Sequence, residues 1–321
     1  MAVDNGADQA VADHATAVAF SPGGAYLLAG TMAGSIHLFR CKDGALVKRC
    51  HCHSGAVLDA LWLTADVFCS GGTDGAVSVR KVLPAAGGVD LQHMRQVSGH
   101  SGHINAVAVS PDGRLLCTAS DDKTACLWEL APVRPSLHLL QHACRFCAAR
   151  RLVLLRAAAR VQADGTEDRA KHTLAAGLAA EGCGSAAKPA PVLACAFRPA
   201  GPSSANPELP LLVATCCGAS SPSTARGAAA VWCCTTGELQ HVFEAGTRQV
   251  AAVAWSPCGR FLAAAAMDKV ARVWEVAQGR QVAAVDVDDI TRSVAWSTAG
   301  RLCFGLGNGA AHVLDLDTEA L

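Results

Sequence analysis

The stretch VAVSPDGRLLCTASDDKTACLWEL at residues 107–130 alternates apolar, strand-like runs with turn residues. A second stretch, VAWSPCGRFLAAAAMDKVARVWEV at residues 253–276, has the same order of parts. In both, an apolar strand is followed by a Ser-Pro-x-Gly turn, a second strand, an Asp-Lys turn and a third strand that contains a tryptophan. Short runs bounded by such turns are typical of β-strands. The two copies predict an all-β fold built from one repeated unit.

Weaker copies of this unit begin at residues 18, 58, 193 and 294. Equivalent positions of the first strand are 42, 47, 88, 58 and 41 residues apart, at Phe20, Trp62, Val109, Phe197, Trp255 and Trp296. A period of roughly 40–45 residues with recurring Asp and Trp is typical of WD40 repeats, each a four-stranded propeller blade. One blade cannot bury both of its faces, so blades stack. We therefore expect a single WD40 β-propeller domain over residues 1–321, with six recognisable blades that either close as a six- to seven-bladed ring or form an open, incomplete arc.

Polar residues recur at fixed places in this unit. In WD repeats, a His before the first strand, a Ser or Thr, the turn Asp and the third-strand Trp form a buried hydrogen-bonded set. The candidates for these structural roles are His14, His53, His100, Thr118, Asp74, Asp122, Asp268, Trp128, Trp232 and Trp274. A His-Asp-Ser trio also suggests a hydrolase triad. Because the same positions recur by repeat, whereas catalysis needs one constellation, we interpret the set as structural and expect neither an enzyme nor a cofactor.

Composition excludes several classes of partner. The chain has 27 basic and 27 acidic residues, so net charge does not indicate binding to nucleic acid or to a membrane surface. No apolar run approaches a membrane span, and the first residues lack the pattern of a signal peptide. Many of the 16 cysteines lie in apolar runs, where free cysteine packs as a small hydrophobe. We expect a soluble, intracellular protein with reduced cysteines.

The gap of 88 residues contains extra sequence without the repeat pattern. The segment LHLLQH, ending at His142, reads as an outer strand, so we place a poorly ordered loop insertion at residues 143–190. The Cys144-x-x-Cys147 pair beside His138 and His142 weakly suggests zinc, but the blade explains both histidines. Residues 150–161 also fit a basic amphipathic helix that docks a partner. A retained intron is a third explanation for the segment.

A second departure lies at residues 216–232, where a longer polar loop replaces the Asp turn. In a WD propeller, this turn and the inter-blade connection open on the same face, so both expansions decorate one face. Loops on a rigid scaffold are where binding usually takes place. Candidate partner-binding residues on that face are Asp121, Lys123, Arg248, Lys269 and Asp289.

The long turn in RPAGPSSANPELPLLVATCC, residues 198–217, is the most specific feature. With it, CHSGAVLDALWLTADVFCSGGTD (52–74), INAVAVSPDGRLLCTASDDKTACLW (104–128) and VLDLD (313–317), the chain resembles the C-terminal propeller of the transducin-β-like corepressor family, the F-box-like/WD-repeat proteins. That family carries a Gly-Pro…Asn-Pro extension between the first two strands of one blade. It also has eight blades after a helical dimerisation segment and an F-box-like region, and counterparts of the first two blades and of those segments are not visible here.

The resemblance implies a non-catalytic interaction scaffold in a nuclear corepressor complex that contains a histone deacetylase and regulates transcription. Its implied partners are complex subunits and histones, and its implied location is the nucleus. A different WD40 adaptor, in a ubiquitin ligase, in RNA processing or in trafficking, is the alternative, because fold does not determine function.

Overall fold

The computed structural model describes residues 13–85, 88–130, 172–174, 190–199, 210–217, 227–297 and 300–315. These residues form strands and turns and contain no helix, which confirms the all-β prediction. Accordingly, this part of the chain has no helix long and apolar enough to cross a membrane. The chain divides into two compact units, residues 1–96 and 97–321.

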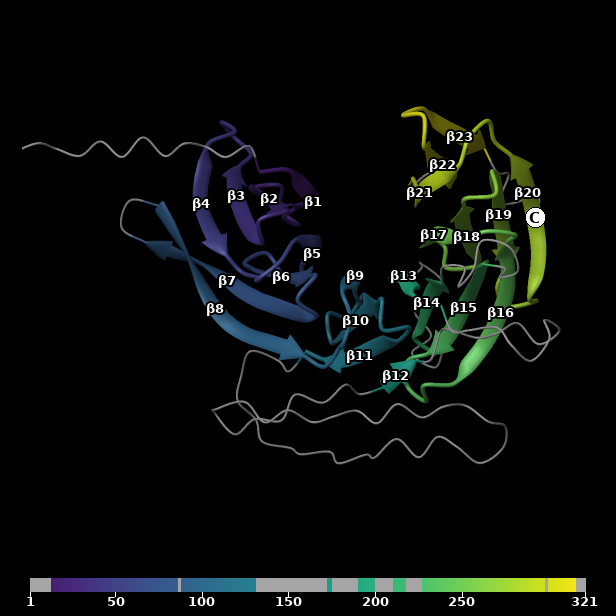
Figure 1. Cartoon of the computed structure of the whole chain (residues 1–321), viewed down its shortest axis with the longest axis horizontal. Coiled ribbons are helices and arrows are strands. Elements are labelled where there is room, and N and C mark those ends of the chain that lie inside the picture. Colours follow the sequence, from purple (N-terminus) through teal and green to yellow (C-terminus); the bar gives the residue numbers. More distant parts are fainter. Residues whose placement is uncertain are drawn as a thin grey trace, which may run out of the picture. The chain divides into compact units, whose positions relative to one another are not determined.

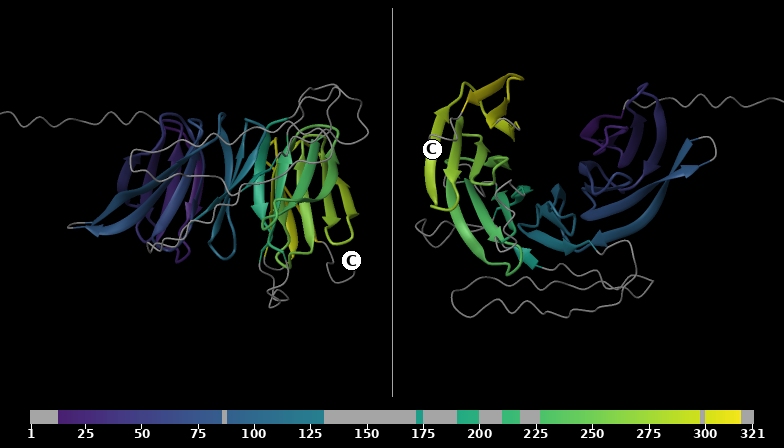
Figure 2. Two further views of the ribbon diagram at one scale, coloured as in Figure 1. Left: turned by 90° about the horizontal axis from the view of Figure 1, so that it is seen from below. Right: turned by 180° about the vertical axis from the view of Figure 1, so that it is seen from behind.

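The first unit contains two four-stranded antiparallel sheets, drawn in purple to blue in Figure 1. In each sheet the strands are hydrogen-bonded in chain order. The first sheet comprises β1 (Ala15–Phe20), β2 (Tyr26–Thr31), β3 (Ser35–Arg40) and β4 (Leu46–His51), and the second comprises β5 (Val57–Trp62), β6 (Val67–Gly72), β7 (Ala76–Ala85) and β8 (Gly88–Ser98). The pair β7 and β8, with 10 and 11 residues, is the longest hairpin among the described strands and stands out in Figures 1 and 2.

The second unit contains three four-stranded sheets and one three-stranded sheet, again antiparallel and in chain order. The third sheet comprises β9 (Ile104–Val109), β10 (Leu115–Ser120), β11 (Ala125–Glu129) and β12 (His172–Leu174), and the fourth comprises β13 (Val192–Phe197), β14 (Leu212–Cys217), β15 (Gly227–Cys233) and β16 (Leu239–Gly246). The fifth comprises β17 (Val250–Trp255), β18 (Phe261–Ala266), β19 (Val270–Glu275) and β20 (Arg280–Asp286), and the sixth comprises β21 (Thr291–Trp296), β22 (Arg301–Leu306) and β23 (Ala311–Asp315). These six sheets are the six expected blades.

Tryptophans of the first strands join neighbouring sheets within each unit. Trp62 Nε1 donates to the carbonyl of Ala19 at 3.1 Å in the first unit. In the second unit, Trp255 donates to Ala196 at 3.0 Å and Trp296 donates to Ala254 at 3.2 Å. In every case the acceptor lies just before the equivalent position of the preceding sheet. The N–H of each indole is thus satisfied, and the rings of Trp62 and Trp255 are buried.

Small side chains allow the sheets of the second unit to pack closely. Strand β18 has the sequence FLAAAA, and its four alanines are all 0% exposed. Alanine is a poor strand former in isolation, but its burial on both faces of the sheet favours it here. Ala263 and Ala265 pack toward Leu302 and Phe304 of the sixth sheet.

The structure corrects the position of the insertion. Strand β12, His172–Leu174, pairs with β11 and completes the third sheet, so part of the predicted loop 143–190 is an outer strand. The segment ending at His142, which the sequence favoured for that strand, lies outside the described residues. An outer strand is paired on one side only and is here three residues long, so composition alone does not distinguish the two apolar segments.

The long turn lies where the sequence placed it, between two regular strands. Phe197 of β13 pairs with Val213 of β14, and the backbone of Arg198 donates to Leu212 at 2.9 Å. The Arg198 guanidinium also donates to the carbonyl of Pro210 at 2.9 Å, which closes the base of the turn. Residues 200–209 lie outside the described part, so Pro202 and Pro207 stay predictions.

Candidate protein-interaction surface

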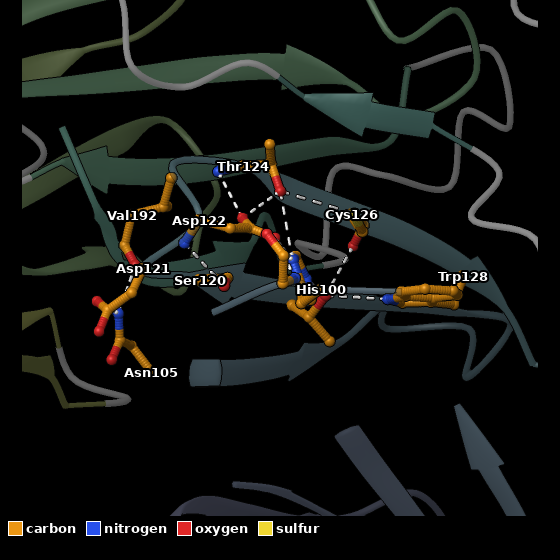
Figure 3. A network of polar contacts seen from close by, with 11 residues as sticks. His100, Asn105, Ser120, Asp121, Asp122, Thr124, Cys126, Trp128 and Val192 are labelled. Atoms are coloured by element: carbon orange, nitrogen blue, oxygen red, sulfur yellow. Dashed lines mark hydrogen bonds and ion pairs between the residues drawn. The ribbon is translucent and has the colours of Figure 1, made fainter. Parts of the chain in front are cut away.

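Buried side chains hold the turn between β10 and β11 through a chain of hydrogen bonds (Figure 3). His100 Nδ1 lies 2.8 Å from Asp122 Oδ2, and His100 Nε2 lies 2.7 Å from Thr118 Oγ1. The indole N–H of Trp128 donates to the same Thr118 hydroxyl at 2.9 Å. Asp122 also accepts the Thr124 hydroxyl at 2.6 Å. The network joins the segment before β9 to β10, to the turn and to β11.

The hydrogen bonds of this network keep both His100 and Asp122 in their charged forms. Burial alone would lower the pKa of His100, yet the hydrogen bond to the Asp122 carboxylate raises that pKa to about 10. Burial likewise would raise the pKa of Asp122, yet the hydrogen bond from His100 brings it to about 2. The two side chains are only 1% and 10% exposed. At neutral pH they form an ion pair inside the sheet.

Two other sheets carry part of the same set. In the second sheet, His53 Nδ1 lies 3.0 Å from Asp74 Oδ1 and His53 Nε2 lies 2.8 Å from Ser70 Oγ. Arg80 stands there at the position of the third-strand tryptophan. In the fourth sheet, Trp232 donates to Thr215 at 2.9 Å, while the turn that follows β14 lies outside the described residues.

The fifth sheet replaces the histidine with an arginine from another strand. Gly246 stands at the position of the histidine, and Arg272 of β19 reaches the turn aspartate instead. Arg272 Nη2 lies 2.9 Å from Asp268 Oδ2, and Nη1 donates to the carbonyl of Ala245 at 2.9 Å. A Cβ on Gly246 would lie 2.9 Å from that of Ala266 and 3.0 Å from Asp268 Oδ2, so a side chain would not fit without a shift.

The tryptophan of the fifth sheet also has a different environment. Trp274 stacks on Phe243, with ring centroids 5.2 Å apart. Ala264 stands at the position that Thr118 occupies in the third sheet, so it offers the indole no hydroxyl. Trp274 therefore contributes through packing rather than through a polar chain.

His14 differs from the expectation, because it is exposed rather than buried in a set. Its sheet has Ala33 at the position of the turn aspartate, so the imidazole has no carboxylate to meet there. Asp13 supplies one from outside the turn, and its Oδ1 accepts the backbone N–H of Ala33 at 3.0 Å. In the sixth sheet, Asn308 Oδ1 accepts the N–H of Ala310 at 2.9 Å.

The anchored turns of the second unit present exposed charges. Lys123 and Lys269 follow the turn aspartates and adopt positive φ values of 76° and 66°. Glycine occupies the equivalent position elsewhere, at Gly34, Gly75 and Gly309. A lysine pays a steric penalty in this left-handed region that glycine avoids. Both lysines are exposed.

We call the set Asp121, Lys123, Arg248, Lys269 and Asp289 the turn face. Lys269 Nζ lies 3.9 Å from Asp289 Oδ1, so the structure brings these two together. Asp121 shares a turn with Lys123 and accepts the Asn105 side-chain amide at 2.7 Å. Arg248 is exposed on the connection before β17. The turn face has mixed charge, and Asp122 and Asp268 accept backbone N–H groups within the turns that carry Lys123 and Lys269.

The geometry of the buried hydrogen-bonded sets favours a structural role over a catalytic one. The same His-Asp contact occurs in two sheets, and the His53 and His100 side chains are 0% and 1% exposed, so a substrate does not reach them. The described residues contain no group of three His, Cys, Asp or Glu side chains that could hold a metal ion. The weak zinc candidates His138, His142, Cys144 and Cys147 lie outside those residues.

Sequence reasoning missed three kinds of contact. Arg272 was not a candidate, although Gly246 at the histidine position signals that something else must fill the space. Asn105 also donates to the carbonyl of Val192 at 3.0 Å, which links the third sheet to the fourth. The first-strand tryptophans were aligned by period, yet their indole hydrogen bonds become visible only once the sheets are stacked.

These features define a class of protein. The sequence matches the family described as "WD domain, G-beta repeat" over residues 9–40, 91–129 and 237–275. Those ranges contain β1–β3, most of β8 with β9–β11, and β16–β19. The chain therefore contains WD40 repeats, and its sheets are those of WD40 propeller blades.

Similar curated proteins share short segments with the chain. The WD40 repeat-containing protein HOS15 of Arabidopsis thaliana is 32% identical over 78 residues, which is 24% of this chain and 12% of that protein. A ribosome biogenesis protein BOP1 homolog of Drosophila virilis is 33% identical over 61 residues, 19% and 8% of the two chains. Protein HIR1 of Mycosarcoma maydis is 34% identical over 76 residues, 24% and 7%. The chain thus spans no more than about an eighth of the length of these relatives.

Proposed function

We propose that this chain is a non-catalytic subunit of a nuclear corepressor complex containing a histone deacetylase, and that the turn face is its contact surface. The observation that carries the proposal is the pair of lysines held at positive φ above buried anchors. Strained residues at a surface are a reason to suspect a binding role. The resemblance of the long turn and of three other segments to the transducin-β-like corepressor family supports the choice of complex.

A ribosome-biogenesis scaffold is the second candidate, because one similar protein carries that function in its name. The two candidate functions predict that different proteins bind to the chain. Affinity purification of the tagged full chain, followed by quantitative mass spectrometry, should recover histones and a histone deacetylase. Recovery of pre-ribosomal proteins without the deacetylase would favour the second candidate and contradict the first.

A matched pair of charge reversals tests the surface. Lys123→Glu reverses a charge on the turn face, and Arg114→Glu reverses an exposed charge at the other end of β10. We expect Lys123→Glu to reduce recovery of the deacetylase at least fivefold, and Arg114→Glu to leave it unchanged. Equal recovery with both variants, at unchanged melting temperature, would show that the turn face is not the contact surface.

A further inference from the structure

Two exposed arginines of the fifth sheet flank one buried glutamate. Arg260 directly precedes β18, Glu275 ends β19 and Arg280 begins β20. In the strand ladders, Glu275 is opposite Phe261 on one side and opposite Arg280 on the other, so the three charged residues lie at one end of three adjacent strands. The Glu275 side chain is 7% exposed, whereas those of Arg260 and Arg280 are 53% and 59% exposed.

Arg260 is fixed by two contacts. Its Nη2 donates to Glu275 Oε1 at 3.2 Å, and its guanidinium carbon lies 5.0 Å from the centroid of the Phe261 ring. A guanidinium group that contacts both a carboxylate and the face of an aromatic ring is held in one orientation. Its remaining N–H groups can donate to a second acceptor.

Arg280 lies close to the same carboxylate without a hydrogen bond to it. Its Nη2 lies 3.7 Å from Glu275 Oε2, and that oxygen accepts no hydrogen bond within the described part of the chain. One carboxylate between two guanidinium groups leaves a single positive charge uncompensated. That charge is at the surface, because the arginines are exposed and the glutamate is buried.

A further arginine approaches from the fourth sheet. Arg198 follows β13, and its Cγ lies 3.1 Å from the position that a Cβ on Gly259 would take. Gly259 directly precedes Arg260 and has a φ of 70°, which also favours glycine. Arg198 donates to the carbonyl of Pro210. Positive charge therefore extends from the fifth sheet toward the base of the long turn.

The third sheet provides an internal comparison. Arg114 stands at the position of Arg260, and Glu129 stands at the position of Glu275. Both Arg114 and Glu129 are exposed, so the third sheet has no buried carboxylate at this place. Arg114 is therefore a matched control for the arginines of the fifth sheet.

We propose that Arg260 and Arg280 dock an acidic segment of a partner protein, with one of its carboxylates bound across both guanidinium groups. Arginine matches the geometry of a carboxylate, and Glu275 shows that one such group can contact both side chains. The uncompensated positive charge complements an acidic segment and disfavours a basic one. This inference goes beyond the proposed function, because the site lies at the opposite end of β18 from Lys269 of the turn face.

Binding of a fluorescein-labelled hexaglutamate peptide to the full chain tests the proposal, with a hexaglutamine peptide as the neutral probe. We expect only hexaglutamate to bind. Arg260→Glu and Arg280→Glu should each weaken that binding at least tenfold, whereas Arg114→Glu should change it less than twofold. Melting curves check that the variants fold. No loss in the first two variants, or an equal loss in Arg114→Glu, would overturn the proposal.

Arg280→Lys distinguishes a fitted carboxylate site from a general positive charge. Lysine keeps the charge but loses the planar fork of donors, so we expect affinity to fall about fivefold. Full affinity in this variant would mean that charge alone attracts the peptide, which contradicts the proposed geometry. Tighter binding of a phosphoserine peptide of equal net charge would assign the site to phosphate groups instead.

The chain's own Glu208 is the competing occupant, because it is the only acidic residue of the long turn between Arg198 and Pro210. If Glu208 occupied the site, Glu208→Gln would raise the affinity for hexaglutamate and the partner segment would be ruled out. Unchanged affinity supports the partner. The probe is a peptide rather than a complex, so these results do not depend on whether the chain recovers a deacetylase.

Discussion

The third and fifth sheets solve the same structural problem with different residues. Both must hold an aspartate in the turn between their second and third strands. In the third sheet, His100 reaches Asp122 from the segment before the first strand. In the fifth sheet, Arg272 reaches Asp268 from within the third strand. Its side chain occupies the space that Gly246 leaves open at the position of the histidine.

The difference shows which part of the anchor these two sheets have in common. The turn carboxylate is kept in both sheets, and in both it accepts backbone N–H groups, from Ser101 and Thr247 respectively. The cation that faces it changes in residue type and in the segment that carries it. Between these two sheets the turn aspartate is kept while its counter-charge changes, whereas the first and sixth sheets have Ala33 and Asn308 at that position.

Removing the turn aspartates should have the largest effect. Asp122→Ala leaves a buried imidazolium without its partner and should lower the free energy of unfolding by about 3 kcal/mol. Asp268→Ala should cost less, about 2 kcal/mol, because Arg272 keeps the carbonyl of Ala245 and is long enough to reach solvent. Urea denaturation of the two variants measures the difference. Equal losses would mean that the two anchors are energetically equivalent.

The next largest effect should appear as a dependence on pH. The pKa of His100 is raised above its unfolded value of about 6.5, so its contribution is complete below that pH and is lost as pH rises toward about 10. The pKa of Asp122 is lowered, so its contribution is complete above about 4 and is lost as pH falls toward about 2. The pair is therefore most stabilising between about pH 4 and 6.5.

Because the pKa of His100 is raised, the third sheet should contribute a decline of stability on the alkaline side. We expect the free energy of unfolding to fall by about 2 kcal/mol between pH 6 and pH 9. His100→Gln should remove most of that decline. It should leave an acidic decline, because the hydrogen bond from Arg272 holds the pKa of Asp268 below its usual value despite burial. An unchanged alkaline decline in this variant would assign it to another group.

The repeat made much of the fold predictable, and its limits are physical. Strands β9–β11 and β17–β19 follow directly from the two best copies, because turn residues and apolar alternation are local signals. Strand β12 was misplaced, because an outer strand has few constraints on its sequence. His14 was assigned to a buried set because its spacing before the first strand fits the repeat. It is exposed, because Ala33 stands at the position of the turn aspartate that would bind it.

The anchors were only partly predictable for a different reason. The positions of His100, Thr118, Asp122 and Trp128 follow from the period, and the structure brings these four together. The role of Arg272 does not follow, because the period locates Gly246 without saying which side chain enters the space above it. That answer depends on the direction of side chains across a stacked sheet.

The two tryptophans should differ by a smaller amount. Trp128→Phe removes an indole N–H that donates to the buried Thr118 hydroxyl, whereas Trp274→Phe removes one from a ring that mainly stacks. We expect Trp128→Phe to cost about 1 kcal/mol more than Trp274→Phe. Thermal melting of the two variants tests this. A larger loss at Trp274 would show that its stacking on Phe243 outweighs the hydrogen bond of the third sheet.

The smallest effect should be a gain, at the lysines that both turns share. Lys123→Gly and Lys269→Gly relieve a left-handed conformation that costs a side chain roughly 1 kcal/mol, while the added freedom of the unfolded chain offsets about half of that. Each variant should therefore be more stable by about 0.5 kcal/mol, and the matched Lys123→Ala should be neutral. If the glycine variants gain stability but recover less deacetylase, the strain is kept for binding. If they gain stability at full recovery, the lysines have no part in partner contact, and the turn face must be narrowed to its remaining charges.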